Sequence, residues 1–133
     1  MNLLAKEYFS LQEISNIWAV SRDDLLYYGE NNILEISVRP AAIAAGIERV
    51  CYNTEFANYL AEGKSQCFSP QPLLPTDIYR IMKAGTDAVP VYHTKYRFHE
   101  KISDIIENKG ILLSYTDLVV TRAEKHCFEI NNG

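Results

Sequence analysis

Residues 8–38 read YFSLQEISNIWAVSRDDLLYYGENNILEISV. Ser10 and Glu13 have the spacing of a capping box, in which each side chain accepts a hydrogen bond from the other residue's backbone amide. Ser21 and Asp24 repeat that spacing, and acidic residues suit the positive end of a helix. The apolar residues after each serine recur at helical spacing and are Leu11, Ile14, Ile17, Trp18, Leu25, Leu26 and Tyr28. The stretch therefore predicts two short helices with a tight connection between them.

The second helix is expected to end at Gly29 and the pair Asn31–Asn32, because Gly and Asn tolerate the left-handed conformation found at helix ends. Residues 33–38 then predict a strand, since apolar and polar residues alternate there. One face of this strand would carry Leu34, Ile36 and Val38, and the other Ile33, Glu35 and Ser37. Two crossed helices and a short strand outline a small winged helix-turn-helix head.

The whole chain predicts an α+β fold. We expect the helix-turn-helix-like head at residues 1–40, followed by a small, mainly antiparallel β lobe with short helices at residues 41–133. Residues 40–46 predict one or two turns of helix or a connector, and residues 47–52 predict a strand. Residues 65–75 carry three of the five prolines, so they predict a loop, or an edge strand that runs into a loop.

Thr76 predicts the N-cap of a further helix, which Gly85 would end. Residues 89–99 alternate strictly and predict a long strand with an aromatic buried face and a basic face in water. The aromatic face would carry Tyr92, Thr94, Tyr96 and Phe98, and the basic face Val91, His93, Lys95, Arg97 and His99. Residues 112–120 predict one or two short strands, and a capping box at Thr121–Glu124 opens a last helix of about two turns.

The composition excludes several classes of protein. The chain has 133 residues and a formal net charge of −4, which argues against a generally basic nucleic-acid coat or a membrane-surface binder. It has no apolar run of membrane-spanning length. Its opening, MNLLAKEYF, lacks the basic and long apolar regions of a signal peptide. We therefore expect a cytoplasmic protein with no membrane partner.

The sequence carries no recognisable catalytic motif: it has no G-x-S-x-G elbow, no glycine-rich phosphate loop and no H-E-x-x-H pair. Its three cysteines are odd in number and widely spaced, so we expect reduced, mostly buried thiols instead of a disulfide framework. We expect a non-enzymatic protein with no catalytic residues, no cofactor and no metal. The alternative for the cysteine thiols is that Cys67 and Cys127 form a zinc site together with His93 and His99.

Several residues of the head have the types and the order of a known sequence pattern. These residues are Tyr8, Ser10, Leu11, Glu13, Ile14, Val20, Ser21, Leu25, Tyr27 and Tyr28. In this order they resemble the DNA-binding heads of MerR-type regulators and excisionases, over residues 8–38 only. The resemblance implies a bacterial DNA-binding transcriptional regulator, of phage or mobile-element type, that binds as a homodimer. Asp117–Glu124 and Phe128 resemble a stretch of uncharacterised bacterial and prophage proteins, which implies no activity.

The residues expected to contact DNA are polar or basic and lie on or near the head or on the predicted basic strand. They are Arg22, Tyr27, Asn31, Arg39, Lys95 and Arg97. Residues 80–101 contain five Lys or Arg against two Asp or Glu, a local net charge of +3. Such a surface could follow a phosphate backbone, although alternating Lys and Arg also suit the solvent face of an ordinary strand.

The charge of the head favours a different partner. Residues 1–39 contain three Lys or Arg against six Asp or Glu, a net charge of −3, whereas a DNA-reading head normally presents a basic face. Arg22 is followed by Asp23 and Asp24 where family members carry basic residues. The alternative function is therefore a protein-interaction or adaptor module that kept the helix-turn-helix fold, lost DNA binding and exposes Tyr27 on its contact face.

Overall fold

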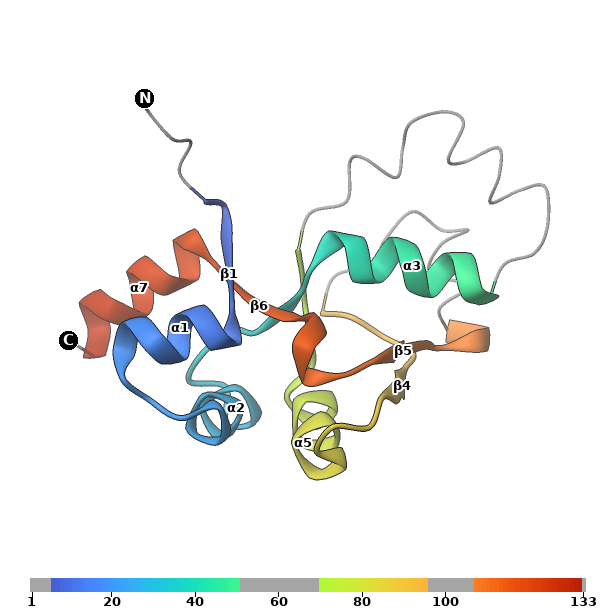
Figure 1. Ribbon diagram of the computed structural model, residues 1–133, viewed down its shortest axis with the longest axis horizontal. Coiled ribbons are helices and arrows are strands. Elements are labelled where there is room, and N and C mark those ends of the chain that lie inside the picture. The colour runs from blue at the N-terminus through green and yellow to red at the C-terminus, as the bar shows by residue number, and fades with distance from the viewer. Residues whose placement is uncertain (1–5, 51–69, 96–106, 133) are drawn as a thin grey trace.

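The computed structural model describes residues 6–50, 70–95 and 107–132, and it has the predicted α+β class. Its strands form a four-stranded and a two-stranded antiparallel sheet (Figure 1). The larger sheet has the order β1-β6-β2-β3, with bounds Tyr8–Ser10, Leu118–Thr121, Ser37–Val38 and Gln71–Pro72. The smaller sheet pairs β4, Val89–Val91, with β5, Ile111–Leu113.

The helices lie at both ends of the larger sheet. The helices whose full bounds the structure describes are α1 (Leu11–Trp18), α2 (Arg22–Glu30), α3 (Pro40–Val50), α5 (Pro75–Ala84), the 3-10 turn η2 (Tyr115–Asp117) and α7 (Arg122–Asn132). In Figure 1, α1, α2 and α7 gather at one end of the molecule, and α3 lies with the small sheet at the other. The α5 helix packs against α2.

The caps of the first two helices confirm the local predictions. Ser10 Oγ accepts from the amide of Glu13 at 3.1 Å, and Glu13 Oε1 accepts from the amide of Ser10 at 3.1 Å. Ser21 Oγ likewise accepts from the amide of Asp24 at 3.1 Å, so Ser21 caps α2 as predicted, whereas the return bond to Asp24 that a full capping box needs is not found there. Lys6 also donates to the Glu13 carboxylate, and this bond is the main cause of the lowered pKa of Glu13. Because backbone amides in the first turns of α1 and α2 have hydrogen-bond partners, packing can hold these short helices in place.

The prediction that Gly29 ends α2 is wrong, because the helix continues through Glu30. Gly29 is buried, and a Cβ there would lie 2.6 Å from Ile36 Cδ1 and 3.1 Å from Ile78 Cγ2. The glycine therefore permits a close approach of α2 to α5 and to the chain before β2. The left-handed residue after the helix is Asn32, with φ 59°.

The strand predicted at residues 33–38 forms a ladder only at Ser37–Val38, but its burial pattern is largely as expected. Leu34, Ile36 and Val38 are buried and Ile33 is exposed, whereas Ser37 is buried against the alternation. A strand at residues 47–52 is wrong for 47–50, which belong to α3, and the rest lies outside the described residues. The helix predicted at residues 40–46 continues to Val50, because its alanine-rich sequence has a high helix propensity.

The helix α5 confirms the stop at Gly85, which has φ 66°, and the burial of Ile78 and Ile81. Its N-cap is Leu74 and not Thr76, because Pro75 occupies the first helical position. The preceding proline-rich segment supplies β3 at the edge of the larger sheet.

The long strand predicted at residues 89–99 is wrong in length and in face. The ladder covers only Val89–Val91, since β4 pairs with a three-residue partner. Val91 is completely buried opposite Ile111, and Tyr92 is exposed, the reverse of the predicted faces. Residues 96–99 lie outside the described residues.

The C-terminal segment has the predicted order of elements. Two short strands flank η2, and Thr121 Oγ1 accepts from the amide of Glu124 at 3.2 Å at the start of α7. The Glu124 carboxylate does not complete the capping box but accepts from the amide of Glu35 at 3.1 Å. The helix has 11 residues, longer than the two turns expected. Cys127 on this helix is exposed, so the expectation of buried thiols fails there.

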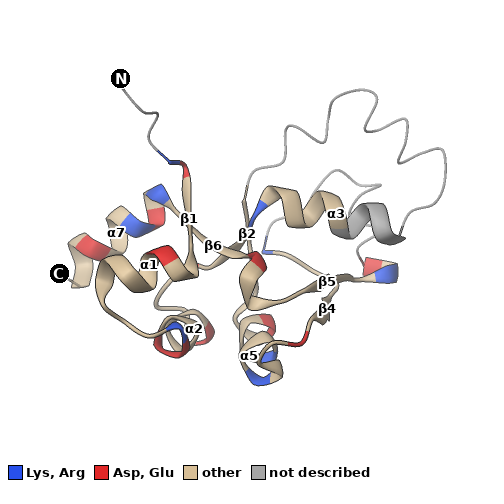
Figure 2. Ribbon diagram, viewed as in Figure 1, with Lys and Arg blue, Asp and Glu red and all other residues tan. Residues whose placement is uncertain are grey.

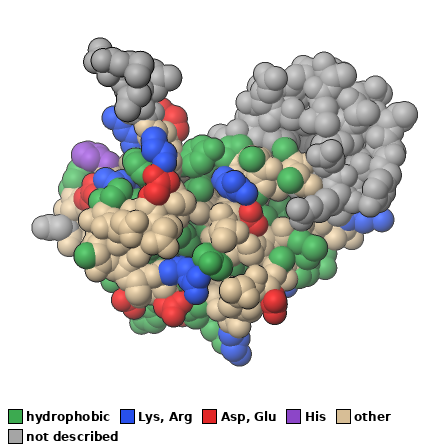
Figure 3. Space-filling view, in the orientation of Figure 1, with side chains coloured by type: hydrophobic (Ala, Val, Ile, Leu, Met, Phe, Trp, Pro, Cys, Tyr) green, Lys and Arg blue, Asp and Glu red, His purple; other side chains and the backbone are tan. Residues whose placement is uncertain are grey.

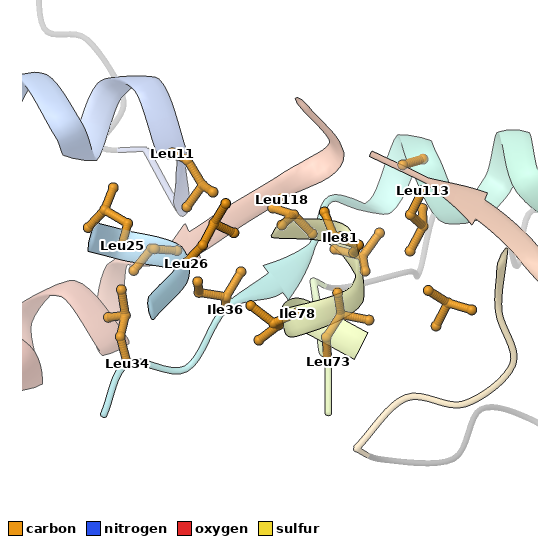
Figure 4. Packing of buried hydrophobic residues seen from close by; sticks show 14 of the residues in the cluster. Leu11, Leu25, Leu26, Leu34, Ile36, Leu73, Ile78, Ile81, Leu113 and Leu118 are labelled. Carbon is orange, nitrogen blue, oxygen red and sulfur yellow. The ribbon is translucent and has the colours of Figure 1, made fainter. Parts of the chain in front are cut away.

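The hydrophobic core runs through both predicted domains. Figure 4 shows a continuous row of side chains from Leu25 and Leu34 through Ile36 and Ile78 to Leu113. Strand β6 lies between β1 and β2, so it joins the end of the chain to the head. A domain boundary at residue 40 stays a prediction, but the sheet and the core are shared across it.

Candidate functional site

Arg22 is half-exposed at the start of α2, and its guanidinium lies against an aromatic ring. The Arg22 Cζ atom lies 3.9 Å from the centroid of the Tyr115 ring, within the range of a cation–π contact. Its Nε atom is 3.9 Å from Asp23 Oδ1. Arg22 therefore connects α2 to η2 and has an acidic neighbour.

Two other predicted DNA contacts form ion pairs. Arg39 Nη2 lies 3.4 Å from Asp117 Oδ1, and the Arg39 amide donates to the Asp117 carbonyl at 3.0 Å. Lys95 Nζ lies 3.1 Å from Glu35 Oε2. Arg97 lies outside the described residues. Among the residues that the structure describes, the basic residues predicted to contact DNA are Arg22, Arg39 and Lys95. Each of them has a carboxylate within 4 Å.

The two uncharged members of the set lie at the C-terminal half of α2. The Tyr27 side chain is 54% exposed. Asn31 Nδ2 donates to the Tyr27 carbonyl at 2.8 Å, so the amide closes the helix end. Tyr27 is available to a partner, whereas the Asn31 side chain has a structural role.

The predicted set does not form one basic surface. The turn η2 brings Arg22 and Arg39 to the same three-residue segment, but Lys95 pairs with the chain before β2. Figure 2 shows Lys and Arg positions spread over α2, α5, α7 and the start of α3. On the face seen in Figure 3, Lys and Arg side chains lie in separate groups, most with Asp or Glu beside them.

The sequence did not reveal an open groove of about 550 Å³ between α1, α2 and α7. Its lining residues are mainly apolar or aromatic and are Trp18, Val20, Tyr28, Ile33, Phe128, Glu129 and Asn132. We call this feature the aromatic groove. Apolar grooves with a few polar groups are the usual form of a binding site.

Ring stacking builds the floor of the aromatic groove. The Trp18 and Phe128 rings are nearly parallel, with centroids 4.6 Å apart and planes at 19°. The Tyr28 ring lies 5.8 Å from the Phe128 ring at 33°. These rings come from three helices that meet because β6 carries α7 back to the head.

A polar contact stands at the side of the same rings. Trp18 Nε1 donates to Glu129 Oε2 at 2.8 Å, and Lys125 Nζ lies 2.9 Å from the same oxygen. The hydrogen bond from Trp18, followed by that from Lys125, lowers the pKa of Glu129. Glu129 therefore remains a carboxylate at neutral pH, and it orients the indole ring in the groove.

Apolar side chains are also exposed on the elements that form the groove. Ile33 in its lining is 50% exposed, and Ile130 on α7 is 67% exposed. Ile17, next to Trp18 on α1, and Tyr27, next to Tyr28 on α2, are exposed as well. Of these exposed residues, only Ile33 lines the groove, and an exposed apolar residue in an apolar concavity is typical of a protein contact surface.

A second concavity of about 510 Å³ lies between β1 and the first turns of α7. Lys6 and Lys125 each lie 5.6 Å from the centroid of the Phe9 ring. Arg122 and His126 add positive or titratable groups to its lining, and Glu7 and Glu129 add carboxylates. The mixture of both charges gives this concavity no clear ligand preference.

No metal cluster is found in the part of the chain that the structure describes: nowhere in it do three His, Cys, Asp or Glu side chains lie close enough to hold an ion. Cys67 and His99 of the zinc alternative lie outside that part. Within the same residues, no helix has both the length and the apolar character needed to cross a bilayer.

Comparisons of the chain with protein-family profiles, with curated proteins and with solved structures found no match.

Proposed function

We propose that this protein is a non-enzymatic protein-interaction module with a helix-turn-helix-like head, and that the aromatic groove is its contact site. The observation that carries the proposal is the groove itself: stacked Trp18 and Phe128 rings form an open apolar concavity beside the exposed Ile33. Aromatic residues that are accessible and already ordered are favoured at interfaces, because they bury much area at a small entropic cost.

The charge distribution supports a protein partner over DNA. Arg22, Arg39 and Lys95 each have a carboxylate within 4 Å. A phosphate contact would have to compete with these partners, and the head as a whole is acidic. An apolar contact at the groove would not disturb the ion pairs.

The proposal is tested with a photo-crosslinking amino acid at position 33 and, as a matched control, at position 112. Ile33 is 50% and Leu112 51% exposed, and Leu112 lies on β5, outside the groove lining. We expect a defined protein adduct at position 33 only, in cells that naturally make this protein. The partner, purified and bound back, should lose affinity by about tenfold or more with Ile33→Ser and not with Leu112→Ser. Identical adducts at both positions would contradict the proposal.

The second candidate is a DNA-binding transcriptional regulator of the MerR or excisionase kind, acting as a homodimer. The observation that favours it is the meeting of Arg22 and Arg39 at η2, beside a capped α2 with Tyr27 exposed. Affinity for duplex DNA would then fall steeply with salt, and Arg22→Ala would reduce the logarithmic slope by about one. Lys83→Ala, on α5, is the control. A flat salt response would exclude this candidate.

A further inference from the structure

We infer that α7 is a detachable wall of the aromatic groove: it leaves the head as one unit while the core stays folded, and the groove exists only while α7 is docked. Two features of the structure point to this behaviour. The helix contributes little to the hydrophobic core, and its contacts with the head are only partly buried. The opening of α7 concerns the fold alone, whereas the dependence of the contact site on α7 rests on the proposed function.

The α7 helix differs from the other described α-helices in what it buries. Each of α1, α2, α3 and α5 places at least two apolar residues in the core, and examples are Ile14, Leu25, Ile43 and Ile78. None of the 11 residues of α7, all of which the structure describes, is buried. Phe128 is its one hydrophobic residue packed against the described core. Segments with few buried apolar contacts are the ones that open locally, at a lower free energy than global unfolding.

The change in burial is abrupt at the start of α7. In β6, Leu118, Val119 and Val120 are buried, and this strand lies between β1 and β2. Thr121 then caps α7, whose described residues are all at least partly exposed. In Figure 1, α7 lies at the end of the molecule, directly after β6. A unit that opens cooperatively can therefore begin just after Thr121, with β6 remaining in the core.

The contacts that dock α7 converge on Trp18. The Phe128 ring stacks on the indole with centroids 4.6 Å apart, and Glu129 Oε2 accepts from the indole Nε1 at 2.8 Å. Near the start of the helix, Glu124 Oε1 accepts from the amide of Glu35 at 3.1 Å. Both hydrogen bonds are only partly buried. Water can replace them when α7 leaves, so their net contribution to docking is small.

The sequence of α7 does not hold the helix together without the head. An isolated helix of 11 residues is marginal in water, because the cost of nucleation is spread over few hydrogen bonds. The helix also ends in Ile130 followed by two Asn residues, and Asn has a low helix propensity. Packing against the head therefore supplies most of its stability, so leaving the head and losing the helix are one event.

Removal of α7 takes the aromatic groove apart. Phe128, Glu129 and Asn132 of its lining belong to α7, and the remaining lining residues would lie on an open surface of the head. A partner that contacts the complete groove would stabilise the docked helix by mass action. By the same linkage, a change that weakens docking would weaken the partner.

Native-state amide hydrogen exchange of the full-length protein tests the opening. We expect residues 126–130 to exchange as one group, with protection factors about a hundredfold or more below those of residues 118–120 in β6. Equal protection of the two segments would overturn the inference, because α7 would then open only with the whole fold. Fast exchange confined to residues 129–132, with 126–128 as protected as β6, would also overturn it, since that is ordinary fraying of a helix end.

A pair of variants at position 126 tests whether the core survives without α7. His126 is exposed on α7, and proline inside a helix removes an amide and clashes with the carbonyl four residues earlier. We expect His126→Pro to keep the protected amides of residues 118–120 and to shift the emission of Trp18, the only Trp of the chain, to the red. The matched control His126→Ala should resemble the wild type in both measurements. Loss of all protection in His126→Pro, or an unchanged Trp18 emission, would overturn the inference.

Crosslinking at position 33 separates this inference from the proposed function. The wild-type adduct tests the proposed function whether or not α7 opens. We expect His126→Pro to lose the adduct and His126→Ala to keep it. An adduct of equal yield in His126→Pro would show that the contact site does not need α7, which overturns that part of the inference. If α7 exchanges as expected and no adduct forms at position 33, the opening stands and the proposed function fails.

Discussion

The rings of Trp18 and Phe128 stack with centroids 4.6 Å apart and an angle of 19° between their planes. Trp18 is the last residue of α1, and Phe128 lies on α7 at the other end of the chain. The pair connects the head to the C-terminal helix and forms the floor of the aromatic groove. The same contact therefore bears on stability and on the proposed function.

Phe128→Ala should destabilise the protein by about 2 kcal/mol, less than for a fully buried Phe, because Phe128 is only partly buried against the core. The loss comes from the contacts with Trp18 and Tyr28. Urea denaturation measures the change. Ile130→Ala, on the exposed face of the same helix, should change the free energy of unfolding by less than about 0.5 kcal/mol. Equal effects of the two substitutions would show that the stack does not stabilise α7.

Gly29→Ala should destabilise the fold by about 1–3 kcal/mol, although alanine has the higher helix propensity. The added Cβ would lie 2.6 Å from Ile36 Cδ1, in a buried contact with α5 nearby. Gly85→Ala meets no atom within 4 Å and carries only the backbone cost of φ 66° with ψ −112°, about 1–3 kcal/mol. Thermal melts of both variants compare the two costs. A more stable Gly29→Ala protein would show that α2 does not approach α5 as closely as described.

The hydrogen bond from Trp18 to Glu129 should make the Trp18 emission depend on pH in the acid range. The pKa of Glu129 is lowered in the folded protein, first by Trp18 and then by Lys125. Its contribution to stability is therefore complete above the unfolded pKa of about 4.3 and is lost as the pH falls through the lower folded pKa. Glu129→Gln should remove the acid transition of the emission while circular dichroism stays unchanged. A transition that persists in this variant would assign it to another group.

The contact between Arg22 and Tyr115 should appear as a coupling energy of about 0.5–1 kcal/mol in a double-mutant cycle with Arg22→Ala and Tyr115→Ala. The distance of 3.9 Å places the guanidinium directly at the ring. Lys83 and Tyr79 provide a matched cycle at 5.5 Å, for which we expect a smaller coupling. Zero coupling for Arg22 and Tyr115 would leave Arg22 free for another partner, and it would strengthen the DNA-binding candidate.

Local sequence predicted the features that depend on neighbouring residues. The serine caps at Ser10 and Ser21, the stop at Gly85 and the start of α7 at Thr121 all formed where the spacing placed them. Each depends on a hydrogen bond or a backbone angle within about one helical turn, so a few residues contain all the information.

Errors arose where a distant segment decides the outcome. The alternating pattern of residues 89–99 predicted a long strand, but a ladder can only be as long as its partner, and β5 has three residues. The sequence predicted Gly29 to be a helix stop, but in the structure Gly29 leaves room for the close approach of Ile36 and Ile78. Neither partner can be inferred from the pattern of the segment itself.

The chain alone thus determined an acidic α+β protein with two capped helices over residues 11–30, because composition and capping are local properties. Only the tertiary structure decided that Arg39 and Lys95 pair with Asp117 and Glu35 and that Phe128 reaches Trp18. These contacts exist because β6 pairs between β1 and β2 and carries α7 back to the head. The sequence pattern of a strand does not show which remote strand it pairs with. The groove, whose helices are brought together by such pairing, therefore could not be predicted from the sequence.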